Sequence, residues 1–198
     1  VLLTIKQRHE LGAGARLNLH VITLHPNVDH DLVSHISGVD SESGIDWMFY
    51  GKGSEKQTLN VRNIFDGREG RGEILMRGIT EDHAYTNCKG MIEIGLKGGG
   101  TNTYLTQEVL MLDSTSKVDA IPALEIKTND VKASHSATVA RVTEEDLFYF
   151  GARGIDPHEA RRMFVLGFLG DITERIPDTA VREEVIAMIE KKYEARSA

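Results

Sequence analysis

The sequence has a single cysteine, Cys88, in 198 residues. One thiol excludes an internal disulfide framework and is typical of proteins of a reducing cytoplasm, where we expect this chain to act. The sequence also has no run of basic residues, and its formal net charge is −7. Nucleic acid and anionic membranes are therefore not expected as partners.

Long apolar runs are missing as well. No stretch approaches the roughly 20 apolar residues of a membrane-spanning helix, and no signal-peptide pattern opens the chain. Hydrophobic residues make up 40% and charged residues 27% of the sequence, an ordinary globular composition that argues against disorder. Because the sequence starts at Val1, within a segment of β character, we expect it to be part of a longer polypeptide.

Between residues 11 and 142 the apolar residues alternate or form short runs. Leu17, Leu19 and Val21 share one face of "ARLNLHVITL", and segments such as "GEILMRGITE" and "TYLTQEVLML" follow. Runs of about five to eight residues bounded by Gly, Asn, Asp or Ser predict strands. Many strands without an intervening helix favour a mainly β fold, and the pattern leaves a sandwich, a barrel and a β-helix open because no strict repeat is visible.

The period then becomes helical. Thr143 is predicted to cap a first helix, Asp156 a second and Asp178 a third, because each precedes a capping pattern and an apolar run. In the second helix Met163 and Gly167 align with neighbouring apolar residues at three- and four-residue steps, which is typical of an amphipathic helix. The sequence therefore predicts a β core over residues 1–142 and a helical region over residues 143–198.

Several polar patterns have a simple structural interpretation. The histidines at every fifth position are His20, His25, His30 and His35. An odd offset turns strand positions to opposite faces, and five residues on a helix turn the side chain by about 140°, so we interpret them as surface histidines rather than a metal cluster. "GKGS" and "GLKGGGT" lack the order of a phosphate loop and predict turns, so this chain is not expected to hydrolyse ATP.

Two residues are candidate ligands. Cys88 could hold iron or carry a persulfide, although a lone cysteine at the start of a strand is more often simply buried. His135, in "NDVKASHSATVAR", is flanked by alanine and serine residues that are too small to screen it. An imidazole on a rigid strand is a competent ligand for iron. A hydrogen bond from the imidazole to a turn carbonyl is the simpler alternative.

Residues 121–177, "IPALEIKTNDVKASHSATVARVTEEDLFYFGARGIDPHEARRMFVLGFLGDITERIP", resemble the C-terminal signature of the SufB/SufD family of iron–sulfur cluster assembly proteins. The segments "PALEI", "SHSATVAR", "LFYFGARGI" and "LGFLGDITERIP" fall in register with that signature without gaps, and the upstream β-rich part resembles the family more loosely. The resemblance implies a flattened parallel β-helix core followed by a small α-helical C-terminal region.

The same resemblance implies a scaffold rather than an enzyme, on which a transient iron–sulfur cluster is assembled. The implied partners are a SufC-like ABC-type ATPase docked on the C-terminal helices, a second SufB/SufD-type chain in a homodimer or heterodimer through the β-helix, and a sulfur donor such as a cysteine desulfurase. The residues that match the ATPase-docking elements are Leu147, Phe148, Tyr149, Arg153, Ile155, Phe164 and Phe168.

His135 matches the histidine of the family's "S-H-G-A-T" segment, which in SufD-type chains is implicated in cluster assembly at the dimer interface. Two family positions differ nearby, since the cysteine before this segment is Ala133 here and the glycine after the histidine is Ser136. The assembly cysteine of SufB-type chains corresponds roughly to Glu108. The chain is therefore expected to be the SufD-like half of a heterodimer, or a minimal scaffold that holds iron through Glu108 and His135.

The missing cysteines also support an alternative function. The chain could be an interaction module that recruits or regulates the ATPase without holding a cluster. A β-helix enzyme acting on polysaccharide is a third hypothesis, and it is disfavoured because no acidic or basic active-site set is recognisable and fold alone does not establish function.

Overall fold

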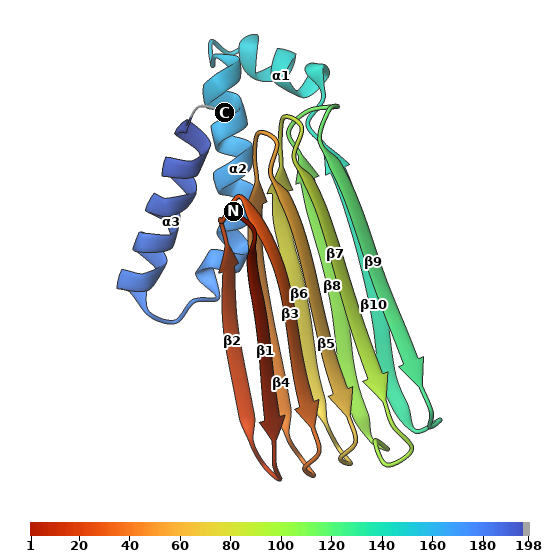
Figure 1. Ribbon diagram of the computed structural model, residues 1–198. Coiled ribbons are helices and arrows are strands. Elements are labelled where there is room, and N and C mark those ends of the chain that lie inside the picture. Colours follow the sequence, from red (N-terminus) through yellow and green to blue (C-terminus); the bar gives the residue numbers. More distant parts are fainter. Residues whose placement is uncertain (196–198) are drawn as a thin grey trace.

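The computed structural model describes residues 1–195, which form ten strands and three helices (Figure 1). The strands are β1 (Leu3–Leu11), β2 (Arg16–Thr23), β3 (Asn27–Ile36), β4 (Glu42–Gly51), β5 (Lys56–Phe65), β6 (Arg71–Thr80), β7 (Tyr85–Ile94), β8 (Thr101–Met111), β9 (Lys117–Ile126) and β10 (Val131–Arg141). The helices are α1 (Glu144–Gly151), α2 (Pro157–Glu174) and α3 (Thr179–Glu194). The last three residues of the predicted helical region 143–198 lie outside the described residues.

All strand pairings in residues 1–195 are parallel. The odd-numbered strands form one five-stranded sheet, sheet A, in the order β1-β3-β5-β7-β9, and the even-numbered strands form sheet B in the order β10-β8-β6-β4-β2. Each turn of the chain adds one strand to each sheet, and the turns stack into a flattened solenoid (Figure 1). The prediction of a mainly β fold with a parallel β-helix core is confirmed.

Side chains that point between the two sheets form the first hydrophobic core. Alternation along each strand places Trp47, Phe49 and Phe65 there, all fully buried. Residues of neighbouring turns lie in register, so that Gln57 of β5 pairs with Thr86 of β7, 29 residues along the chain. Because both of these side chains are buried, the interior contains polar as well as apolar rows.

The spaced histidines do not share one site. His30 points into the first core, where its ring centroid lies 4.6 Å from that of Trp47 and burial lowers the pKa of its imidazole. The expectation of a surface position is therefore wrong for His30, because its strand position alternates into the interior. His25 is exposed, and His20 and His35 are partly exposed.

The two glycine-rich segments form turns between strands, as predicted. Gly53 has a φ of 64° and Gly100 a φ of 80°. This left-handed conformation favours glycine, because a residue with a Cβ atom is strained there.

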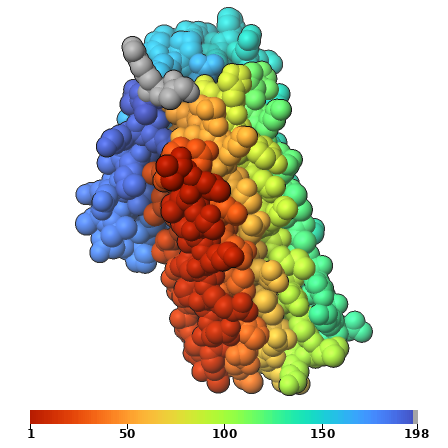
Figure 2. All heavy atoms as spheres, viewed as in Figure 1, coloured from red at the N-terminus to blue at the C-terminus, as the bar shows by residue number. Residues whose placement is uncertain are grey.

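Helices α2 and α3 pack on the outer face of sheet B, beside the solenoid (Figures 1 and 2). Their buried side chains and those of the sheet form a second core, which includes Met48, Leu75, Ile79 and Leu110 of the sheet and Val165, Leu169, Ile172, Val185 and Ile189 of the helices. No helix in residues 1–195 is long and apolar enough to cross a lipid bilayer.

The predicted caps are confirmed, because Thr143, Asp156 and Asp178 each accept a backbone N–H from the first turn of their helix. The amphipathic face predicted for α2 is only partly right. Met163 is 44% exposed and Gly167 is exposed. The helix turns an adjacent face, rather than the face that carries these two residues, toward the sheet.

The solenoid is open at its last turn. β9 is an edge strand of sheet A and β10 is an edge strand of sheet B, and within residues 1–195 no strand pairs with their outer edges. An unpaired edge presents a row of free backbone N–H and C=O groups. The last turn is therefore able to accept another strand.

Candidate functional site at the open end of the solenoid

His135 lies on β10, the edge strand of the last turn. It pairs in register with Leu105 of β8, which belongs to the first core, so the His135 side chain faces the interior side of sheet B. It is nevertheless exposed, because among residues 1–195 no further strand lies over it. Within the described part of the chain, the imidazole is therefore exposed at the open end of the solenoid.

The neighbours of His135 on the inner face of β10 are small. Ala133 and Ala137 occupy the neighbouring inward positions of β10, and Ala120 lies on β9 in register with Cys88. None of the three alanine side chains extends beyond Cβ. The small residues noted beside His135 in the sequence therefore open the inner face of the edge strand.

Glu108 does not share this site. It alternates with the inward residues of β8 and points to the outer face of sheet B, where Arg77 Nε donates to its Oε2 at 2.6 Å. Within one chain the structure therefore does not bring Glu108 and His135 together, because the sheet separates their side chains. Glu108 instead helps to hold the helical layer, since Arg77 also contacts Asp171 of α2 at 2.9 Å.

Cys88 is fully buried in the first core, as the simpler interpretation of its position predicted. Its Sγ atom lies 3.6 Å from the carbonyl oxygen of Asp119. Burial raises the pKa of the thiol to about 12. The thiolate that would bind iron or carry a persulfide is disfavoured at neutral pH.

The predicted docking residues divide into two groups. Phe148 is 77% and Tyr149 56% exposed on α1, and the guanidinium of Arg153 lies 3.7 Å from the centroid of the Tyr149 ring. Leu147, Phe164 and Phe168 pack against the second core, and Ile155 is partly buried. Only the first group forms an exposed aromatic surface.

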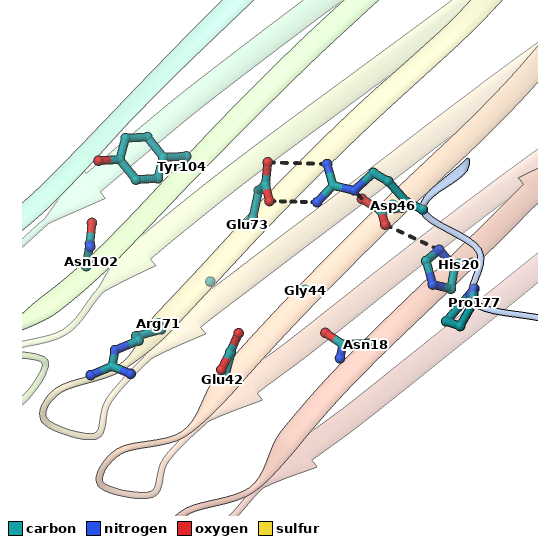
Figure 3. A pocket seen from close by; sticks show the side chains of 12 residues that line it. Asn18, His20, Glu42, Gly44, Asp46, Arg71, Glu73, Asn102, Tyr104 and Pro177 are labelled. Atoms are coloured by element: carbon teal, nitrogen blue, oxygen red, sulfur yellow. Dashed lines mark hydrogen bonds and ion pairs between the residues drawn. The ribbon is translucent and has the colours of Figure 1, made fainter. Parts of the chain in front are cut away.

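Sheet B carries a polar cleft of about 420 Å³ where the linker between α2 and α3 crosses its outer face (Figure 3). Arg175 forms ion pairs with Asp46 at 3.2 Å and with Glu73 at 2.7 Å, and His20 lies 3.2 Å from the other Asp46 oxygen. Burial raises the pKa of Asp46, although Arg175 acts against this effect. The charges at this end of the cleft are therefore paired with one another, and the contacts of Arg175 are long-range ones that no local sequence pattern signalled.

Within residues 1–195 there is no group of three or more His, Cys, Asp or Glu side chains arranged to hold a metal ion. His135 alone is a single ligand, while bound iron needs several. An iron–sulfur cluster would therefore need ligands beyond those in residues 1–195.

These features define a class of protein in which a parallel β-solenoid carries a layer of α-helices on the outer face of one of its sheets. The family model described as "SUF system FeS cluster assembly, SufBD core domain" matches residues 2–168. The chain belongs to the SufB/SufD family.

The relatives include two proteins named iron–sulfur cluster assembly protein SufD. The one from Bacillus subtilis is 32% identical over 142 residues, which cover 72% of this chain and 32% of the relative. The one from Escherichia coli is 33% identical over 115 residues, which cover 58% of this chain and 27% of the relative. An iron–sulfur cluster assembly SufBD family protein of Mycobacterium leprae is 31% identical over 168 residues, which cover 72% of this chain and 42% of the relative. The chain thus spans about a third of the length of the curated relatives that it matches.

Proposed function

We propose that this chain is a scaffold component of a SUF-type iron–sulfur cluster assembly complex and that His135 is the ligand it contributes. The observation that carries the proposal is an exposed imidazole on an edge strand, flanked on the same strand face by Ala133 and Ala137. A neutral imidazole is a good ligand for iron. The role is that of a scaffold, without catalysis by this chain.

A second SufB/SufD-type chain completes the site in this proposal. β10 offers 11 residues for pairing and contains no proline, whereas β9 carries Pro122, which lacks a backbone N–H. Strand addition at the β10 edge would place ligands of the partner near His135. The partner is a second copy of this chain or a related chain that carries the cysteines missing here. A sulfur donor such as a cysteine desulfurase would supply the sulfide.

A SufC-like ABC-type ATPase is the proposed motor. The exposed surface formed by Phe148, Tyr149 and Arg153 has the composition of a binding hot spot, since aromatic side chains and arginine dominate such contacts. ATP hydrolysis belongs to that separate chain.

One observation favours a second candidate function. The chain offers a single candidate ligand, and its cysteine is deeply buried. Both features also fit a module that recruits or regulates the ATPase without holding a cluster. In that case the His135 segment would serve dimerisation only.

Anaerobic reconstitution with iron and sulfide in the presence of the partner chains separates the two functions. A cluster-holding scaffold should develop the visible absorbance of sulfide-bound iron, and His135→Ala should reduce the bound iron. His83→Ala is the matched control, because His83 is an exposed histidine in the turn before β7. Equal iron binding by wild type and His135→Ala would exclude His135 as a ligand.

A further inference from the structure

Arg77 connects the helical layer to sheet B. Its side chain is 15% exposed and lies on the outer face of β6, where Nε donates to Glu108 Oε2 at 2.6 Å. Nη1 donates to Asp171 Oδ2 at 2.9 Å, and the guanidinium carbon lies 5.4 Å from the centroid of the Phe168 ring. One side chain thus binds strand β8 and helix α2 at the same time.

The geometry of this contact is demanding. A guanidinium is planar, and its donors point in fixed directions, so both carboxylates must stay in place for both bonds to form. Helix shifts of about 1–2 Å are common in conformational transitions, and such a shift exceeds the tolerance of a hydrogen bond. A movement of α2 would therefore break the contact or carry β6 and β8 with it.

The contact leads toward His135. Glu108 pairs in register with Thr138 of β10, the strand that carries His135. Two arginines form ion pairs between sheet B and α2 or the linker after α2 in residues 1–195. Arg77 of β6 binds Asp171 of α2 and also Glu108 of β8. Arg175 instead binds Asp46 of β4 and Glu73 of β6. The Arg77 contact is thus the charged link that lies nearest to the edge strand.

We propose that Arg77 is a positioning residue that couples α2 to the β8–β10 strand pair, so that an ATPase docked on the helical layer adjusts how His135 is presented. The coupling to an ATPase rests on the proposed function. The positioning of β10 by α2 does not, and it is tested on this chain alone.

Amide hydrogen–deuterium exchange measures this positioning, because it reports local opening of strands. Asp171→Asn removes the negative charge that Arg77 contacts on α2, and so weakens the link. Because the Asp171 side chain is 80% exposed, the fold should remain intact. We expect exchange in residues 131–141 to rise by about threefold or more. Glu174→Gln, an exposed carboxylate on the same helix, is the matched control and should leave exchange in β10 unchanged. Unchanged exchange in Asp171→Asn overturns the positioning role.

The second measurement includes the SufC-like ATPase and ATP. In Arg77→Met and Asp171→Asn, the ATP-dependent change in iron and sulfide loading should fall by about fivefold or more, a typical size for allosteric coupling. Loading without ATP and ATPase affinity should stay within about twofold of wild type. Arg77→Lys keeps the positive charge but lacks the planar guanidinium that binds two carboxylates at once. It should therefore restore little of the ATP-dependent change in loading.

The outcomes are distinguishable. If loading without ATP falls in the same proportion as the ATP-dependent part, Arg77 is merely structural and the coupling is wrong. If the wild type binds neither the ATPase nor iron and sulfide, the proposed function fails, while the exchange measurement still decides whether α2 positions β10.

Discussion

The hydroxyl of Tyr50 donates a hydrogen bond of 2.9 Å to Glu81 at the edge of the second core, and Lys52 contacts the same carboxylate oxygen at 2.9 Å. Glu81 is only 7% exposed. Its burial raises the pKa of the carboxyl, although Lys52 acts in the opposite direction. This buried group should make stability depend on pH.

The sign follows from proton binding. Between the ordinary value of 4.5 and the raised pKa of the folded state, the native protein holds more protons than the unfolded chain, so the free energy of unfolding falls as pH rises through this window. Glu81→Gln removes this titration. In urea denaturation at a series of pH values, the difference in unfolding free energy should therefore shift in favour of the variant as pH rises above 4.5. A difference that does not change with pH would contradict the assignment.

Gly78 lies where the sheet interior has no space for a side chain. A Cβ atom at this position would lie 2.2 Å from the Phe49 ring. Overpacking of this kind costs about 1–3 kcal/mol or more, so Gly78→Ala should lower the midpoint of denaturation. Gly167→Ala is the control, because nothing lies within 4 Å of a Cβ on this exposed helical position. It should stabilise the protein by about 0.5–1 kcal/mol.

The local features of this fold could be predicted from the sequence, and the stacking of its turns could not. Strand alternation and helix caps depend on neighbouring residues, and Thr143 and Asp156 were identifiable for that reason. The stacked rows are chemically mixed. Val28 pairs with Gln57, and Gln57 pairs with Thr86. Because the residues stacked in one row differ in chemical type, the successive turns leave no visible repeat in the sequence.

The candidate site was predictable only in part for the same reason. His135 could be found through its sequence segment. Whether Glu108 shares its face depends on the register between β8 and β10, in which Glu108 pairs with Thr138 rather than with His135. Register between strands is a tertiary property, and a change of one residue reverses the face. The contacts of Arg77 with β8 and α2 depend on packing over a long sequence separation.

Cys88 should be chemically silent in the folded protein. Its side chain has no exposed surface, and its raised pKa of about 12 leaves little thiolate at neutral pH. We expect a thiol-specific reagent to label it only at the rate of unfolding, with full labelling in denaturant. Rapid labelling of the native protein would show that the thiol is accessible and would reopen its role as a ligand.

The two groups of predicted docking residues should separate by assay. Phe148→Ala removes a side chain that is 77% exposed, so stability should change by less than about 0.5 kcal/mol, while affinity for the ATPase should fall by about tenfold. Phe164→Ala removes a ring that packs on Phe150 with centroids 5.4 Å apart and should cost about 2–4 kcal/mol. Calorimetric titration and denaturation measure the two effects. Loss of affinity in neither variant would move the docking surface away from α1.

The open last turn makes a prediction about assembly. Val139 is 47% exposed on the inward-facing side of the edge strand β10. If a second chain adds to this edge, Val139→Asp places a charge in the new interface and should weaken the dimer by tenfold or more, which corresponds to about 1.4 kcal/mol. Val39→Asp is a matched control, because Val39 is 53% exposed but lies in the turn before β4. Sedimentation equilibrium measures both variants. An equal effect of the two substitutions would mean that the β10 edge is not the interface, because only a strand-specific contact distinguishes two valines of similar exposure.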